Sequence, residues 1–211
     1  KNTEHIGMIE INPNNSNEIF VAAYGPLWKE GGQRGLYFSK NGGLDWELIL
    51  KTDENTGINE VHIDPRNPNT LYATAHQRRR HVFTYIGGGP GSKIYKSNDG
   101  GKNWRVLKNG LPTAIKGRIG MDISPANPDY LYALVEAEND QKGLYVSKNR
   151  GESWKKVNKY VTSGNYYQEV FCDPLNKDKV FFMDTWLHHT IDGGKNILKT
   201  GEKSKHVDNH C

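Results

Sequence analysis

The sequence predicts an all-β fold made of repeated antiparallel units, and two short motifs that alternate along the chain carry this prediction. The first motif has proline second, asparagine fourth, an aliphatic residue eighth and an aromatic residue ninth; it occupies 12–20, 64–72, 124–132 and 173–181. The second has serine or threonine third, asparagine or aspartate fifth and glycine seventh; it occupies 37–46, 95–104, 145–154 and 188–197. Strict alternation of two motifs indicates an internal repeat.

Each repeat contains four runs with strand character. An apolar run such as 119–123 leads into the first motif, a turn in which proline fixes φ and asparagine or aspartate accepts bonds from nearby backbone amides. A β-branched and aromatic run such as 70–75 follows, and a variable stretch then leads to a strand such as 93–97. The second motif turns the chain into a fourth strand. Four short antiparallel strands in about 40–60 residues are typical of a β-propeller blade.

We therefore expect blades at approximately 5–50, 57–107, 117–157 and 166–199, with 200–211 as the start of a further blade. Because propellers have roughly four to eight blades, the simplest interpretation is an arc of a larger propeller. A closed ring of four blades is the alternative.

The second motif has the composition of a tight turn. Asp99 can accept hydrogen bonds from amides of its own loop, Gly100 and Gly101 can take positive φ, and Trp104 supplies packing area. The same structural role is expected of Ser39, Asn41, Trp46, Ser97, Ser147, Asn149, Trp154, Thr190 and Asp192. The fourth repeat departs from the pattern at His188 and Ile197, so we expect a looser outer hairpin there.

The composition limits the classes of partner. A net charge of +4 is too small to indicate nucleic acid, and no apolar run is long enough to span a membrane. The two cysteines, Cys172 and Cys211, are far apart and form no CxxC motif, so they define no disulfide framework; Cys172 is expected to pack in the core. No cofactor motif is present.

The pattern S-x-D-x-G-x-x-W at Ser97, Asp99, Gly101 and Trp104 resembles the Asp-box, or bacterial neuraminidase repeat. With the segments AHQRRR…GGGPGSKIYKSNDGG and GRIGMDISPANPDYLYALVEAE, nearly the whole chain is similar to exported bacterial propellers of the sortilin-like, glycosyl-hydrolase-like group. This resemblance implies an extracellular, cell-surface or periplasmic location. It leaves function open, because Asp-box propellers include glycosidases, peptide receptors and assembly factors.

Blade topology places both motifs on one face and the variable connections on the other, where function is expected. The longest variable connection, 77–92, reads QRRRHVFTYIGGGPGS. Its glycines lack the GK[ST] of a phosphate loop. One interpretation is that Arg78, Arg79 and Arg80 pair with acidic loops, with Phe83 and Tyr85 packed beneath them.

The functional interpretation is that these arginines bind a carboxylate or sulfate of a glycan or polypeptide. Exposed aromatic side chains would then provide stacking surfaces, and one arginine is expected near the central channel. The candidate ligand-binding residues are Trp28, Arg78, Arg79, Arg80, Tyr85, Arg118, Tyr166 and Trp186. The remaining blades of the same protein are a second expected partner, and a non-catalytic assembly scaffold is a further alternative.

Two other sets of residues are candidates for chemistry. Glu60 and Glu169 each precede an Asp-Pro turn by four residues, so they are either polar residues at a channel mouth or an acid–base pair acting on a glycosidic bond. His206, Asp208 and His210 alternate at period two and would share one side of a strand, as ligands of a transition metal do.

Overall fold

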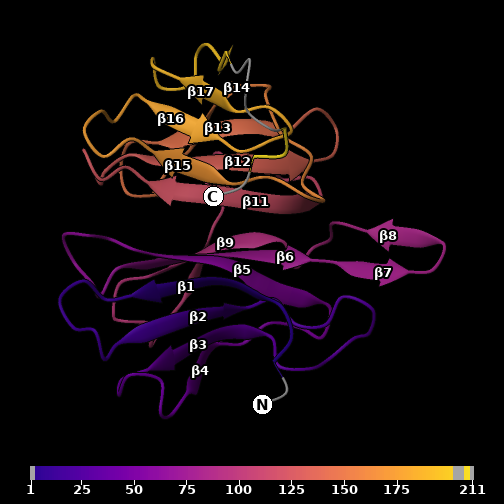
Figure 1. Ribbon diagram of the computed structural model, residues 1–211, viewed down its shortest axis with the longest axis vertical. Helices are drawn as coiled ribbons and strands as arrows, with labels where there is room; N and C mark the ends of the chain where they lie inside the picture. The colour runs from indigo at the N-terminus through magenta and orange to yellow at the C-terminus, as the bar shows by residue number, and fades with distance from the viewer. Residues whose placement is uncertain (1–2, 202–206, 210–211) are drawn as a thin grey trace. The chain divides into compact units, whose positions relative to one another are not determined.

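A computed structural model of the chain describes residues 3–201 and 207–209. Within these residues the regular elements are all β-strands, as the sequence predicts (Figure 1). The first sheet contains β1 (Ile6–Ile11), β2 (Ile19–Ala23), β3 (Gly35–Ser39) and β4 (Glu47–Leu50). The second contains β5 (Thr56–Ile63), β6 (Leu71–Gln77), β9 (Lys93–Ser97) and β10 (Arg105–Leu107).

The next two sheets repeat this antiparallel order. The third contains β11 (Lys116–Ile123), β12 (Leu131–Ala137), β13 (Gly143–Ser147) and β14 (Lys155–Asn158). The fourth contains β15 (Val170–Cys172), β16 (Val180–Phe182), β17 (His188–Thr190) and β18 (Leu198–Lys199). A short hairpin, β7 (Arg79–His81) with β8 (Thr84–Ile86), is inserted between β6 and β9. Such four-stranded meanders are the blades of a β-propeller.

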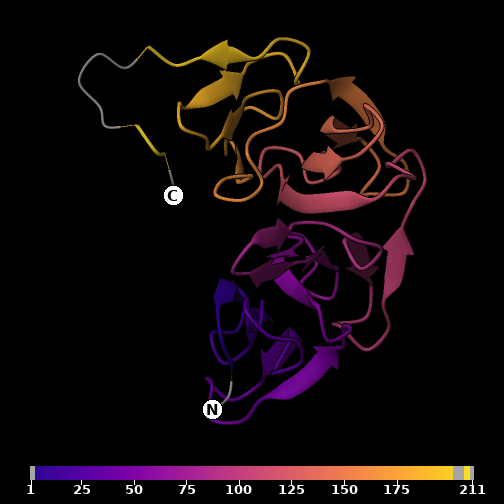
Figure 2. The same ribbon diagram turned by 90° about the vertical axis from the view of Figure 1, so that its right-hand side faces the viewer.

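The chain divides into two compact units, 1–107 and 108–211, and in each of them two sheets pack face to face (Figures 1 and 2). In the first unit, alternate residues of β2 and β3 such as Phe20 and Leu36 meet Ile58, Val61 and Leu71 of the second sheet. The core of the second unit joins the third and fourth sheets through Tyr132, Leu134, Leu144, Val146, Val170, Val180 and Phe182. Alternate residues of a strand thus face the core of the unit, and in β5 and β6 the residues between them are buried as well.

The two motif turns of each sheet are joined by the same backbone hydrogen bond. The amide of Gly42 donates to the carbonyl of Asn17 at 2.9 Å, and the amide of Gly100 donates to Asn69 at 2.9 Å. The equivalent bonds run from Arg150 to Asp129 and from Gly193 to Asp178. In every sheet the turn between the first two strands therefore lies against the turn between the last two, which leaves the other connections at the opposite end.

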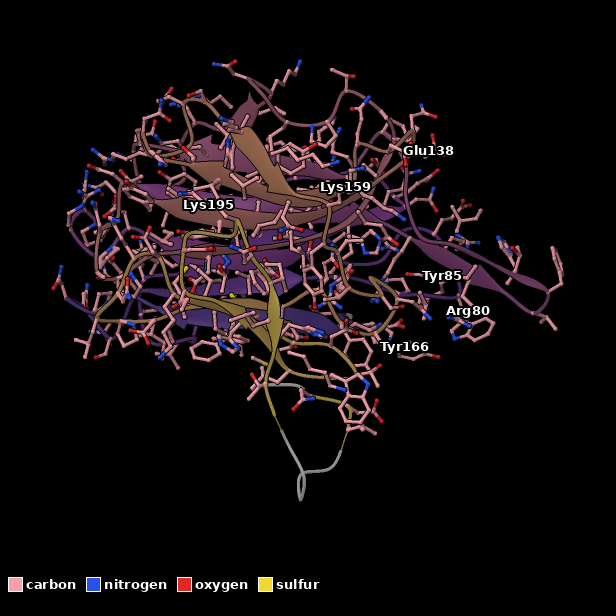
Figure 3. All side chains as sticks on the ribbon, turned by 90° about the horizontal axis from the view of Figure 1, so that it is seen from above. Arg80, Tyr85, Glu138, Lys159, Tyr166 and Lys195 are labelled. Carbon is pink, nitrogen blue, oxygen red and sulfur yellow. The ribbon has the colours of Figure 1, made fainter. Side chains whose placement is uncertain are left out.

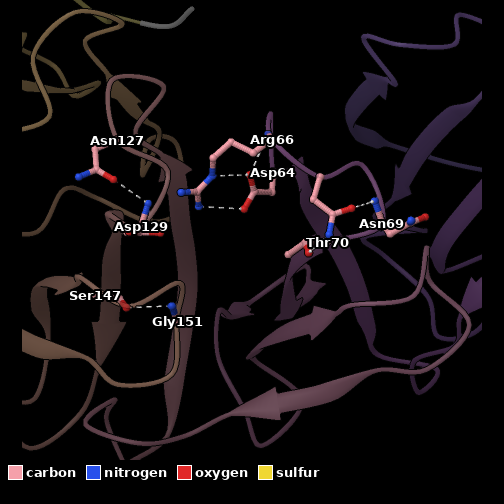
Figure 4. A network of polar contacts seen from close by, with 9 residues as sticks. Asp64, Arg66, Asn69, Thr70, Asn127, Asp129, Ser147 and Gly151 are labelled. Carbon is pink, nitrogen blue, oxygen red and sulfur yellow. Dashed lines mark hydrogen bonds and ion pairs between the residues drawn. The ribbon is translucent and has the colours of Figure 1, made fainter.

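Side chains close each turn from within. Ser97 Oγ donates to Asp99 Oδ1 at 2.8 Å and accepts from the amide of Gly101 at 2.9 Å. Ser147 and Gly151 make the equivalent bond at 2.8 Å in the second unit (Figure 4). The first motif is closed by its acidic or amide residue, as where Asp64 accepts from the amide of Arg66 at 2.9 Å.

The fourth sheet has the shortest outer strands, three residues in β17 and two in β18. Ile197 takes the place of tryptophan there and still packs against the core of the second unit. The described part of 200–211 contains no strand. No helix among the described residues is long and apolar enough to cross a membrane.

Candidate functional site

Three variable connections of the first unit meet at one place. They are the connections between β2 and β3, between β4 and β5, and between β6 and β9. The amide of Arg80 donates to the carbonyl of Leu27 at 2.9 Å, the amide of Arg78 donates to Asn55 at 3.1 Å, and a third bond of 2.8 Å joins the first two connections. The backbone of the arginine segment is therefore fixed by both of its neighbours.

The β7–β8 hairpin extends away from the sheets of the first unit (Figure 1). Its register pairs Arg80 with Tyr85 and His81 with Thr84. Because side chains alternate along a strand, Arg80 and Tyr85 share one face of the hairpin, and Arg79, His81 and Ile86 share the other. Figure 3 shows Arg80 and Tyr85 together on the hairpin, and the guanidinium of Arg80 lies 4.8 Å from the centre of the Tyr85 ring.

A buried chain of polar groups holds the base of the hairpin. The Nε2 atom of His76 donates to the carbonyl of Gly87 at 3.0 Å, since a carbonyl can only accept. In the neutral ring Nδ1 is then an acceptor, and it receives the hydroxyl of Tyr24. The guanidinium of Arg78 stacks on the ring of the same tyrosine, 3.3 Å from its centre.

Arg34 fixes the shape of the connection between β2 and β3. Its guanidinium is buried and donates to the carbonyls of Gly31 at 2.8 Å, Tyr24 at 2.9 Å and Pro26 at 2.5 Å. Burial, and next the charge of Arg78, lower the pKa of Arg34 from its ordinary value. An arginine that donates to several carbonyls of one loop sets the shape of that loop. No motif in the sequence points to Arg34.

A pocket of about 290 Å³ lies between the hairpin and these connections. It is lined by Glu30, Asn55, Gln77, Arg78, Arg79, His81 and Ile86. The sequence predicts the arginines of this pocket and the connections that supply its other residues, but it does not predict the two carboxamides. Only their place at the end of β6 and just before β5 could have pointed to them.

Apart from the carboxylate of Glu30 and the ring of His81, the polar groups left over among the described residues of this pocket are hydrogen-bond donors. The Oδ1 atom of Asn55 accepts from Arg79 at 3.3 Å, and the Oε1 atom of Gln77 accepts from the amide of Gly91 at 2.9 Å. These bonds leave the two NH₂ groups as the unused halves of the carboxamides. Among the described residues, the Nε atom of Arg79 is buried without a hydrogen-bond partner. Glu30 is the one carboxylate of the lining, 4.0 Å from Arg79.

The interpretation that packs Phe83 beneath the arginines is wrong. Phe83 is 88% exposed at the tip of the hairpin, because the short strands β7 and β8 carry the tip away from the sheets. Its ring stacks on His81, with centroids 5.8 Å apart. Trp28 is also exposed, in the connection that contributes Leu27 and Glu30.

The remaining candidate ligand-binding residues lie in the second unit. Arg118 is 3.4 Å from a carboxylate oxygen of Glu169 and donates to the carbonyl of Tyr166, whose ring is exposed. Glu136 accepts from the amide of Arg118 at 3.2 Å, and burial raises the pKa of this carboxyl. Trp186 is covered by the ammonium of Lys199, 3.4 Å from its ring centre. The structure thus joins Arg118 to the backbone of Tyr166. Trp186 instead makes a cation–π contact with Lys199.

The two candidate catalytic carboxylates belong to different units. Glu60 is 5% exposed within β5, 3.5 Å from the imidazole of His62 and 3.4 Å from the hydroxyl of Thr74. Glu169 is paired with Arg118. Each carboxylate therefore has a partner within its own unit.

Of the candidate metal ligands, His206 and His210 lie outside the described residues, as does Cys211. The carboxylate of Asp208 accepts the hydroxyl of Tyr167. In the described ranges, no group of three histidine, cysteine, aspartate or glutamate side chains is placed to hold a metal ion.

Repeated four-stranded meanders and a polar site on their variable connections define a β-propeller domain. The family described as sortilin, neurotensin receptor 3 (Sortilin-Vps10) matches residues 34–190. The chain belongs to this family. It is 33% identical over 133 residues to sortilin of Rattus norvegicus, a match that covers 62% of this chain and 14% of the rat protein. The matching sortilin of Mus musculus gives the same values.

Solved structures show the same fold. The GH74 xyloglucanase of Xanthomonas campestris superposes with a TM-score of 0.68 at 13% identity, over 90% of this chain and 28% of the enzyme. YCF48 bound to D1 peptide superposes with a TM-score of 0.59 at 12% identity, over 99% of this chain and 57% of YCF48. The chain therefore spans about one seventh of the length of the sortilins and under a third of that of the xyloglucanase.

Proposed function

We propose that the chain is a ligand-binding module of a larger exported β-propeller protein, and that it binds an oxyanion of a glycan or polypeptide at the pocket beside β7–β8. The observation that carries the proposal is the excess of hydrogen-bond donors in that pocket. Arg79 Nε and the NH₂ groups of Asn55 and Gln77 can all donate to one acceptor-rich group. Carboxylates and sulfates match such donors, and a guanidinium can bind them through two parallel bonds.

The fixed backbone of residues 78–80 supports the proposed binding of an oxyanion. Arg78 is stacked on Tyr24, and the amides of Arg78 and Arg80 are tied to neighbouring connections. The donors of Arg79 are therefore oriented before a ligand arrives, which reduces the entropy lost on binding. Trp28, exposed in the adjoining connection, offers an aromatic surface for the rest of an extended ligand.

The surface of the first sheet supports a larger propeller. Ile9, Val21, Tyr37 and Leu48 form one row across its four strands on the side away from the core. Ile9 and Leu48 are exposed. Apolar rows of this kind pack against a neighbouring sheet in both units, so a further blade is the partner that fits this face.

The proposal is tested with matched pairs of probes. Capped peptides of four glutamates or four glutamines, and tetramers of galacturonate or galactose, differ in charge but not in length. We expect the charged member of a pair to bind, and Arg79→Gln to weaken that binding by about tenfold or more, since hydrogen bonds to charged groups contribute roughly 1.5–3 kcal/mol. Arg105→Gln, at an exposed position of β10, is the control.

Equal binding of charged and neutral probes would contradict the proposal, and so would an Arg79→Gln protein that binds like the wild type. Preference for the peptide or for the glycan decides which class of ligand the module takes. Because Arg79 lies partly exposed outside the core, loss of fold is not expected to confuse the result.

A further inference from the structure

The tip of the β7–β8 hairpin exposes two adjacent apolar side chains. Val82 is 96% exposed and Phe83 is 88% exposed. Neither belongs to the core that joins the first two sheets. Single exposed apolar residues are common on protein surfaces, but a pair at the end of a projecting hairpin forms a contact point that the fold itself does not use.

The needs of the turn do not explain these residues either. Two-residue hairpin turns favour asparagine, aspartate or glycine with positive φ. In the longer connection 138–142, between β12 and β13, residues of these types also take positive φ: Asn139 has φ 55° and Asp140 has φ 57°. Neither Val82 nor Phe83 has positive φ, and valine and phenylalanine are poor turn formers. The tip therefore carries apolar residues against local preference, which indicates an intermolecular contact.

The type of side chain on the hairpin changes from the tip towards the base. The pair His81 and Thr84 comes first, then the pair Arg80 and Tyr85. At about 3.4 Å per residue, Arg80 and Tyr85 lie roughly 7 Å behind Val82. No residue of 78–86 is acidic.

This order corresponds to the layers of a bilayer surface. Apolar side chains of peripheral proteins enter the boundary between headgroups and acyl chains by about 5–10 Å. Arginine and tyrosine favour the headgroup layer, where arginine is attracted to anionic lipid. The stacking of Arg80 on Tyr85 keeps both side chains at this depth. At the base of the hairpin Glu30, 4.0 Å from Arg79, limits how far the hairpin can enter.

We propose that the Val82–Phe83 tip inserts into the surface of an anionic lipid bilayer, with Arg80 and Tyr85 at the level of the headgroups. A protein pocket could also receive a phenylalanine, but it would not require a cationic and aromatic pair at a set distance behind the tip. The contact uses the face and tip of the hairpin and leaves the donors of Asn55, Gln77 and Arg79 untouched, so it is independent of the function proposed for the pocket.

The test is co-flotation of the whole chain with phosphatidylcholine vesicles that contain or lack phosphatidylglycerol. We expect binding to the anionic vesicles, and a loss of about tenfold or more in the double variant Val82→Ser, Phe83→Ser, because two apolar side chains no longer leave water. The matched control is Leu44→Ser, Leu175→Ser, which removes two other highly exposed side chains. It should bind like the wild type.

A second measurement reports insertion directly. In Phe83→Trp, the added tryptophan fluorescence should shift to shorter wavelength with anionic vesicles and be quenched by lipids brominated near the headgroup end of the acyl chain. Arg80→Glu should weaken binding, with Arg105→Glu as its control.

Two results would overturn the proposal. One is wild-type binding by the Val82→Ser, Phe83→Ser variant, which would mean that charge alone attracts the hairpin. Another is no binding to anionic vesicles together with an unchanged Phe83→Trp spectrum. In that case the tip contacts a protein instead.

Discussion

The guanidinium of Arg78 lies 3.3 Å from the centre of the Tyr24 ring, and this contact joins two connections of the first unit beside the proposed binding pocket. The same tyrosine donates its hydroxyl to His76, whose other nitrogen donates to Gly87 just after β8. Tyr24 therefore anchors both ends of the hairpin, although it is buried and contributes nothing to the pocket lining.

Replacement of Tyr24 should release the hairpin. We expect Tyr24→Leu to destabilise the fold by about 2–4 kcal/mol, since it removes a buried ring, a cation–π contact and a hydrogen bond. Tyr24→Phe keeps the ring and should cost about 1 kcal/mol. Hydrogen exchange at the amide of Arg80 should accelerate in the leucine variant far more than in the phenylalanine variant. Equal acceleration would show that the ring does not hold the hairpin.

The serine of the second motif should matter more than its position in a turn suggests. Ser97 is buried, and its Oγ accepts from the buried amide of Gly101 at 2.9 Å. Ser97→Ala leaves this amide without its acceptor, so we expect a loss of about 1–3 kcal/mol in urea unfolding. Asn98→Ala, at the next and exposed position, should change the free energy of unfolding by less than about 0.5 kcal/mol. Similar effects of both variants would contradict a structural role for the serine.

The aspartate of that turn should stay ionised to a lower pH than an ordinary aspartate does. The backbone amide of Asn103, followed by its side chain and by Ser97, lowers the pKa of Asp99 from 3.8 to about 2. Because the folded pKa lies below the unfolded one, the stabilisation is fully present above about pH 4 and is lost as the pH falls through 2. A carbon-detected NMR titration of Asp99 should give a midpoint near 2, and a midpoint near 4 would contradict these bonds.

The first sheet suggests a compensating variant for this turn. There Asn41 donates its side-chain amide to Asp45 at 2.9 Å, whereas Asp99 accepts from Asn103 at 2.7 Å. We expect Asp99→Asn to be destabilising and the added change Asn103→Asp to restore part of the loss, because the pair then has the donor and acceptor arrangement of the first sheet. A double variant no more stable than Asp99→Asn would show that the two positions are not coupled.

The candidate catalytic carboxylate Glu169 should behave as a member of a structural pair with Arg118. Arg118 and Glu169 lie 3.4 Å apart, and both are largely buried. A double-mutant cycle with Arg118→Met and Glu169→Gln should give a coupling energy of about 0.5–3 kcal/mol. Negligible coupling would leave Glu169 available for another role, and we would then look for turnover of glycan probes that disappears in Glu169→Gln.

The repeat motifs predicted the fold well because each motif is closed by its own residues. Asp99 bonds within its turn, and Asp64 bonds to Arg66 two residues away, so the local sequence is sufficient to specify both turns. The fourth repeat departs from the second motif at His188 and Ile197, and its strands β17 and β18 are correspondingly short.

The candidate site was predictable only in part, because long-range contacts create it. Nothing near Asn55 in the sequence shows that its carbonyl accepts from Arg78 or that its side chain accepts from Arg79. The burial of Arg34, which donates to four backbone carbonyls, is likewise a property of the assembled loops. The exposure of Phe83 depends on the length of the hairpin, and an aromatic residue in an apolar run gives no sign of it.

The most direct test of the account is the NMR signal of the side-chain Nε–H group of Arg79, observed while galacturonate tetramer or the capped glutamate peptide is added. In the free protein this group is buried without a hydrogen-bond partner among the described residues. We expect its proton resonance to move downfield and its exchange with water to slow as the oxyanion accepts the bond, with no change on addition of the neutral probes. A signal that stays in place at saturating charged probe would contradict the pocket as the ligand site.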